Sequence, residues 1–393
     1  MATQQNPAVI NKQFMEYSYE QPISANAQNG TAYATGTALN FDAPIVPGAY
    51  ATKIRIKTNL TVNYTPAGTS PTESLNAGAP WNVWQQFNVD FGNRQITIHP
   101  YFLKVLSNLN GYLRQNPAQT LGAQSTSAQS KIYQAPTMNS GNNTWEHMTE
   151  IPLNGAHPMS PEGIIPISGS GTRLQIQLVP ATAFVGADPL NNVVSTNGTV
   201  SVTGSVTVTV YYRSYQSFFT RSPLAPVMNG LATVQIIKPQ SINPLTAGQY
   251  MFKRILNPYP VIKSVSVVVD GQSSSTFCSY SNIDGFEIDS AENTSSMMRR
   301  YDSTTGGFEN YLEDVRKWTG QDFDDGVLVF DPTLENQANS SNRAGKNYLN
   351  LTSQGFPAAR LGFNVGAVST ANSITPRVET YTMILNPNGI LTA

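Results

Sequence analysis

The chain has few of the residues on which most kinds of functional site depend. Of its 393 residues, one is a cysteine, three are histidines and only 12% are charged. A single cysteine, Cys278, excludes an intramolecular disulfide framework and a thiolate zinc cage. Charge is about half of the usual ~25%, and the net charge is −1. Because nothing here would neutralise a run of phosphates, we expect no direct nucleic-acid binding.

Targeting and membrane signals are also missing. No apolar run approaches the ~18 residues that a membrane span needs. Residues 1–11 lack a basic segment followed by an apolar one, so we expect no secretory signal and folding in a cytoplasm.

Catalytic motifs are lacking too. There is no Gly-x-Ser-x-Gly, no phosphate-binding Gly-x-x-x-x-Gly-Lys and no Gly-x-Gly-x-x-Gly opening a helix. His99, His147 and His157 do not have the spacing of a helical zinc motif. Cys278 lies in an apparent strand, where a small buried residue is the simplest interpretation. We therefore predict no enzyme activity and no catalytic, cofactor or metal residues.

Two local clusters allow alternative interpretations. The acidic run 322–326 offers oxygen ligands for calcium but lacks the later bidentate Glu, so a solvated turn is favoured. The aromatic residues from Tyr211 to Phe219 suit a sugar platform, but alternating strand aromatics more often fill a core or a subunit interface. Neither cluster assembles an active site.

What the sequence does contain is a pattern of short alternating strands. In residues 52–64, Ile54, Ile56, Leu60 and Val62 alternate with polar residues, and the gap after Ile56 is typical of a bulge. Similar strands are predicted at 200–212, 234–237, 250–256, 261–269, 327–330, 360–365 and 377–385. Polar stretches at 115–145 and 331–358 are predicted to be exposed loops.

The layout of strands occurs twice, with one amphipathic helix at a matching point in each half. The helices are predicted at 100–113 and 308–318, the second with acidic residues at its start and basic residues at its end. Two β-domains with one helix each indicate a tandem duplication, for which jelly rolls are the fitting all-β fold. Pro223 and Pro226 lie in the linker between the halves.

The first 36 residues are predicted to be an N-terminal arm, which either docks on something or is a disordered tail. Within it, Val9, Ile10, Phe14 and Met15 can line one face of a short helix. The predicted domains are an arm at 1–36, a first jelly roll at 37–222, a linker at 223–233, a second jelly roll at 234–388 and a tail at 389–393.

Four strings, in this order along the chain, resemble the major capsid protein of tectiviruses, the membrane-containing bacteriophages of the PRD1 type. They are 184–190 (FVGADPL), 211–218 (YYRSYQSF), 318–330 (WTGQDFDDGVLVF) and 377–385 (RVETYTMIL). Each string alone is weak, and their shared order carries the resemblance over most of the chain.

The resemblance implies two tandem eight-stranded jelly rolls and a structural, non-catalytic role. It further implies a homotrimer with a pseudo-hexagonal footprint, tiling an icosahedral capsid around an internal membrane. In such a virion the partners are neighbouring capsomers, the membrane, and vertex or minor capsid proteins, with synthesis in the host cytoplasm. The arm would face the membrane through Val9, Ile10, Phe14 and Met15.

Two other functions remain as alternatives. The first is a tandem β-sandwich adhesin or receptor-binding protein, which would need a sugar-binding aromatic patch. The second is a β-sandwich hydrolase, whose candidate carboxylates Asp284, Glu287 and Asp289 have no distinguishing spacing.

Overall fold

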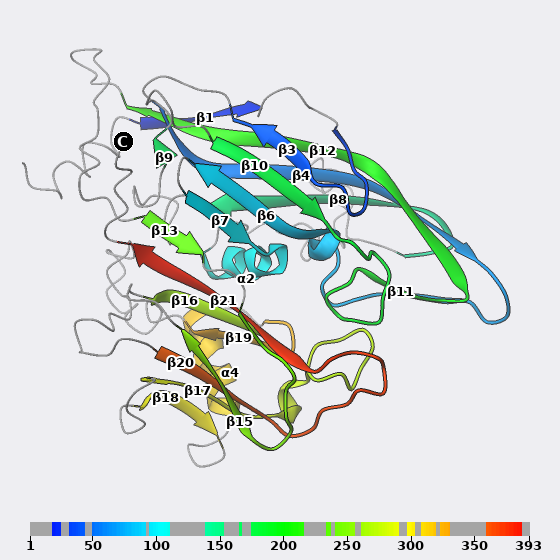
Figure 1. Cartoon of the computed structure of the whole chain (residues 1–393), viewed down its shortest axis with the longest axis vertical. Coiled ribbons are helices and arrows are strands. Elements are labelled where there is room, and N and C mark those ends of the chain that lie inside the picture. Colours follow the sequence, from blue (N-terminus) through cyan, green and yellow to red (C-terminus); the bar gives the residue numbers. More distant parts are fainter. Residues whose placement is uncertain are drawn as a thin grey trace, which may run out of the picture.

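The structure, a computed structural model, consists of two β-sandwiches that lie side by side, each with one helix (Figure 1). The residues that it describes are 18–24, 31–43, 49–91, 94–110, 138–152, 165–166, 174–215, 233–236, 240–255, 261–290, 297–302, 308–319, 323–330 and 359–386. Of the helices within these ranges, none is long and apolar enough to cross a membrane.

The first sandwich is built from two antiparallel sheets. The β12 sheet has the order β1 (Ser18–Ser24), β12 (Gly198–Tyr215), β4 (Ala49–Pro66), β8 (Gly141–Pro152), with β2 (Thr31–Ala32) on β12 and β9 (Ile165–Pro166) on β4. The β10 sheet has the order β3 (Leu39–Asp42), β10 (Leu174–Pro180), β6 (Trp84–Phe91), β7 (Arg94–Ile98). Helix α2 (Pro100–Asn110) connects β7 to β8, η1 is Trp81–Val83, and β5 (Thr72–Leu75) pairs with β11 (Val193–Thr196).

The second sandwich repeats this plan. The β21 sheet has the order β13 (Thr233–Ile236), β21 (Arg377–Asn386), β16 (Val261–Val269), β19 (Val327–Phe330), with β14 (Gln240–Ile242) on β21. The β20 sheet has the order β15 (Tyr250–Ile255), β20 (Ala359–Val365), β17 (Ile283–Ser290), β18 (Met297–Asp302). Helix α4 (Phe308–Thr319) connects β18 to β19, and η2 is Tyr280–Asn282.

Strand β4 shows how alternation determines which face is buried. Ile54, Ile56, Leu60 and Val62 point into the first sandwich, as predicted, and are at most 2% exposed. The predicted bulge after Ile56 is wrong, because Thr58 also points inward, and its hydroxyl accepts a hydrogen bond of 3.0 Å from the Trp84 indole. A buried hydroxyl with a partner can therefore occupy a core position. The register between β4 and its neighbour β12 shifts instead at Tyr211 and Tyr212 of β12.

Helix α4 matches its prediction closely, since it begins at Phe308 and ends one residue beyond the predicted 318. Phe308 and Tyr311, three residues apart on one face, pack into the second sandwich, and the Tyr311 hydroxyl donates to the Val329 carbonyl at 3.2 Å. The predicted helix at 100–113 is described as far as Asn110.

Several expected segments differ from the structure or lie outside its described residues. Ser18–Ser24, expected within the arm, forms β1 and pairs with β12. The predicted loop at 115–145 is wrong from Gly141 onward, because β8 begins there and pairs with the full alternating strand β4. Most of the linker (223–232) and the tail (389–393) lie outside the described residues.

Candidate functional site

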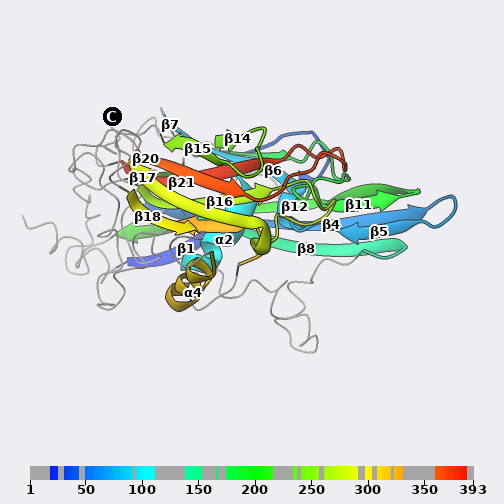
Figure 2. The ribbon, with the colours of Figure 1, turned by 90° about the horizontal axis from the view of Figure 1, so that it is seen from below.

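The candidate site is the junction between the two sandwiches, where α2 of the first lies against the β21 sheet of the second (Figures 1 and 2). Two aromatic residues in the first turn of α2 reach across. The ring of Phe102 lies 5.4 Å from that of Tyr381, and the ring of Tyr101 lies 5.1 Å from that of Phe277. All four of these side chains are at most 3% exposed.

The outer face of the β21 sheet, meaning the face turned away from its own sandwich, is apolar. Val265, Val267 and Val329 on that face belong to one continuous hydrophobic cluster with the core of the first sandwich. Their neighbours Val268 and Leu328 point the other way, into the second sandwich. A sheet that is buried on both faces needs apolar residues on both. The two sandwiches are therefore joined by a core and form one unit.

A buried lysine crosses the same junction. The side chain of Lys104 on α2 is only 8% exposed and forms an ion pair with Asp324, in the turn before β19. The Tyr101 hydroxyl donates to the same carboxylate at 2.6 Å. Burial, and then the neighbouring Asp324 charge, raise the pKa of Tyr101 well above its usual value. Asp324 thus satisfies two buried groups that belong to the other sandwich.

A second polar link joins the loop before β11 to the start of β21. The Arg377 guanidinium lies 2.8 Å from the Asp188 carboxylate of the first sandwich and 3.0 Å from Glu379 on its own strand. The backbone adds a link, since the Ala77 amide donates to the Ser275 carbonyl at 2.9 Å. These contacts add polar links between the two sandwiches to the Lys104–Asp324 pair.

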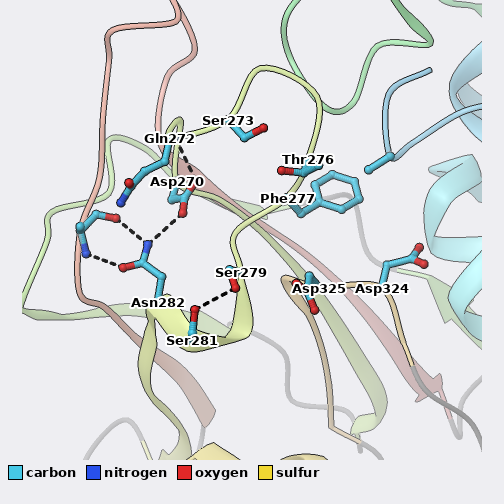
Figure 3. Close-up of a pocket in the computed structure, with 12 residues that line it drawn as sticks. Asp270, Gln272, Ser273, Thr276, Phe277, Ser279, Ser281, Asn282, Asp324 and Asp325 are labelled. Atoms are coloured by element: carbon cyan, nitrogen blue, oxygen red, sulfur yellow. Dashed lines mark hydrogen bonds between the residues drawn. The ribbon is translucent and has the colours of Figure 1, made fainter. Parts of the chain in front are cut away.

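A cavity of about 740 Å³ opens beside this junction, and Figure 3 shows its lining. Asp270, Asp324 and Asp325 line it. Two of them already have partners: the Asn282 amide donates to Asp270 at 2.8 Å, and Asp324 is paired with Lys104. Among the described residues, no group of three His, Cys, Asp or Glu side chains is arranged to hold a metal ion.

The structure separates the residues that the sequence singled out. His99 lies at the junction, its ring 5.2 Å from that of Tyr381, and burial together with Arg377 lowers its pKa to about 4. His147 is buried inside the first sandwich, 4.5 Å from the Trp81 ring, and burial lowers its pKa to about 3. His157 lies outside the described residues. Cys278 is fully buried, as predicted, but it lies in the segment between β16 and η2 and not in a strand.

The two ambiguous clusters have structural roles where they are described. In the acidic run 322–326, Asp324 joins the sandwiches, a role that the interpretation as a solvated turn missed. In the aromatic run, Tyr212 is buried in the core, whereas Tyr211 lies on the outer face beneath Lys53 and Arg55. Val9, Ile10, Phe14 and Met15 lie outside the described residues.

Comparisons by sequence find nothing: no protein-family model matches the chain, and neither does any curated protein. Comparison by structure finds matches along nearly the whole length. The crystal structure of the major capsid protein of STIV (Sulfolobus Turreted Icosahedral Virus) matches with a TM-score of 0.62 at 13% identity, covering 96% of this chain and 99% of that one. The fold is a double jelly roll.

Two further double jelly rolls match at similar coverage. A chain of the PBCV-1 virus capsid matches with a TM-score of 0.56 at 12% identity, covering 94% of this chain and 93% of that one. The Faustovirus major capsid protein matches with a TM-score of 0.50 at 9% identity, covering 94% and 90%. The predicted fold class is therefore confirmed. Each jelly roll has two four-stranded layers when β1 with β2, β8 with β9, and β13 with β14 are counted as interrupted single strands.

Proposed function

We propose that this double jelly roll is the major capsid protein of an icosahedral virus and acts by self-assembly without catalysis. The observation that carries the proposal is the pair of jelly rolls with equivalent strand orders, joined by a common core. Proteins with the same two-domain arrangement over at least nine-tenths of their length include the STIV and Faustovirus major capsid proteins.

A pair of similar domains joined by a common core supports a trimeric capsomer. Three copies of a chain with two equivalent domains place six similar wedges around one axis, and such a unit tiles a hexagonal lattice from a single gene product. The low charge of 12% fits extensive contacts between copies, because few ionised groups must lose their hydration. Neighbouring capsomers are then the main partners, and five-fold positions need a different vertex or minor protein.

The finer parts of the proposal rest on the resemblance to tectiviruses. In this proposal the shell encloses an internal membrane, and the arm faces that membrane through Val9, Ile10, Phe14 and Met15. Co-sedimentation of the full chain with anionic lipid vesicles tests this. We expect binding that is lost when these four residues are replaced by serine; equal binding by both forms would refute the membrane contact.

One observation favours the adhesin alternative. Among the described residues, Phe252 is the one exposed large hydrophobic side chain, with 40% of its surface accessible to solvent. Its ring stacks on that of Tyr250, with the ring centroids 5.9 Å apart. The Arg360 guanidinium lies 4.0 Å from the centre of the Phe252 ring. Exposed stacked aromatics are also suited to sugar rings.

Native mass separates the two functions. Light scattering on the purified chain is expected to give three times the chain mass of 42.6 kDa, with persistence on heating. A monomer would contradict the capsomer, and glycan binding lost in Phe252→Ala would then establish the adhesin.

A further inference from the structure

The two jelly rolls are equivalent element by element, and this equivalence has a consequence for assembly. The strand order β1-β12-β4-β8 corresponds to β13-β21-β16-β19, and β3-β10-β6-β7 corresponds to β15-β20-β17-β18. Helix α2 occupies the same place in the first domain as α4 in the second. Within the chain, α2 lies against the outer face of the β21 sheet. The equivalent contact would place α4 on the outer face of a β12 sheet.

That equivalent contact is not made within one chain. Helix α4 packs on β17 and β18 of its own domain, and Figure 1 places it well away from β12 and β4. The burial of the two helices differs accordingly. All of residues 100–105 in α2 are buried, whereas Glu309, Asn310 and Glu313 of α4 are exposed. When the helices are aligned from their first residues, the exposed Glu309 and Asn310 correspond to Tyr101 and Phe102, which reach across the junction.

The outer face of the β12 sheet has features that match. Lys53, Arg55 and Lys57 on β4 alternate with the inward Ile54, Ile56 and Thr58, so the three cations share the outer face. Arg55 is paired there with Glu150 of β8, so the two lysines are the cations that the contact uses. Tyr211 on β12 is the cross-strand partner of Lys53, just as Tyr381 on β21 is the partner of Val265. Tyr211 therefore occupies the register position on the β12 sheet that Tyr381 occupies on the β21 sheet, with Lys53 and Arg55 over its ring.

We propose that α4 of one copy docks on the outer face of the β12 sheet of a second copy, with Glu309 and Glu313 against Lys53 and Lys57 beside Tyr211. The partner is a second copy of this chain, because one chain carries both surfaces, α4 and the outer face of the β12 sheet, but they do not meet within it. Repetition of this head-to-tail contact closes a ring of three chains. The inference rests on the proposed function and specifies which surfaces join the copies.

The chemistry of the two contacts explains why they are not exchanged. The junction within the chain is apolar, with Phe102 on Tyr381, and the ion pair beside it has its lysine on the helix. The contact between chains has carboxylates on the helix and lysines on the sheet. A contact between copies is exposed to water before assembly, so it is expected to be more polar than a domain core. Opposite charge also guides the correct helix to the correct sheet.

Charge reversal and charge exchange test the proposal. We expect Glu309→Lys with Glu313→Lys, or Lys53→Glu with Lys57→Glu, to weaken trimer association about tenfold or more at low salt, because like charges then face each other. Combining all four substitutions restores opposite charges and is expected to restore association. The defect should shrink as salt rises, since the Debye length falls from ~10 Å at 0.1 M to ~3 Å at 1 M. Sedimentation equilibrium of the full chain measures the association.

The controls separate failure of this inference from failure of the capsomer. Glu73→Lys with Asp284→Lys reverses as many charges away from both surfaces and is expected to leave association unchanged. If the wild-type chain is not trimeric, the capsomer proposal itself fails. If the wild-type chain is trimeric and neither charge-reversed variant associates more weakly, the docking surface is refuted. It is also refuted if the variant with all four substitutions associates more weakly than either charge-reversed variant. The Glu309/Glu313 variant changes α4 and the Lys53/Lys57 variant changes β4. If circular dichroism shows that one of these variants is misfolded, the other still tests the proposal.

Discussion

The ion pair between Lys104 and Asp324 offers the sharpest test of the junction. The change is Asp324→Ala, alone and with Lys104→Met, which keeps most of the buried aliphatic stem and removes the charge. Asp324→Ala leaves a lysine with an 8% exposed side chain, and the Tyr101 hydroxyl, without their shared acceptor. The Asp324 side chain is itself 38% exposed, so water can partly replace it.

The expected cost follows from these two exposures. Removing one partner of a fully buried pair costs about 3–5 kcal/mol, and losing a hydrogen bond to a charged group costs about 1.5–3 kcal/mol. Because solvent reaches the Asp324 side chain, we expect Asp324→Ala to cost less than the loss of a fully buried partner. The expected loss of unfolding free energy is about 2–3 kcal/mol. Lys104→Met alone should cost less, and the double variant should regain about 1–2 kcal/mol relative to additivity.

Guanidinium unfolding at one protein concentration measures these energies, with circular dichroism and tryptophan fluorescence as independent probes. Trp81, Trp84 and Trp145 lie buried in the first jelly roll, so fluorescence mainly reports that domain. The exposed Asp284 provides a matched control, and Asp284→Ala should change stability by less than about 0.5 kcal/mol. A cost for Asp324→Ala no larger than this control, or strict additivity with Lys104→Met, would refute the bridging role.

Three further predictions concern other parts of the fold. Arg377→Met, which removes contacts to Asp188 and Glu379, should cost about 1–3 kcal/mol in the same unfolding assay; no loss would show that this link contributes nothing. Because burial lowers the pKa of His147 to about 3 and of His99 to about 4 from 6.5, the unfolded chain binds more protons below pH 6.5. The unfolding free energy should therefore fall with acid below that pH, by up to about 1.4 kcal/mol per unit per histidine, and His147→Gln should reduce the slope; an unchanged slope would contradict burial of a neutral His147. Gly271 has φ of 74°, and a Cβ there would lie 2.0 Å from the Ser369 carbonyl oxygen, so Gly271→Ala should lower the unfolding midpoint by an amount corresponding to about 2 kcal/mol or more; an unchanged midpoint would contradict this turn.

Most of the fold could be predicted because the strands are half-buried and alternate with period two. Residues 261–269 and 327–330 were predicted to the residue, and α4 nearly so, since a stripe of Phe308 and Tyr311 identifies its buried face. The alternation failed at Thr58, where a hydroxyl that bonds to Trp84 takes a core position. Pattern alone does not distinguish such a residue from a bulge.

The junction could not be predicted in the same way, because its contacts join residues far apart in sequence. Asp324 and Lys104 are 220 positions apart, and nothing in either local sequence identifies the other. One signal was present: β16 carries valines at 265, 267, 268 and 269, on both of its faces. A strand that is apolar on both sides indicates a sheet that is buried on both faces. This signal would have identified the face of the second domain that contacts the first.

The proposed function requires that this chain forms trimeric capsomers with six jelly rolls in a ring. A three-dimensional cryo-electron microscopy map of the purified assembly tests it most directly. We expect three chains around one axis, six β-sandwiches in a pseudo-hexagonal outline, and α4 of each chain on the β12 sheet of the next. A monomer, or a ring in which the number of jelly rolls is not six, would contradict it.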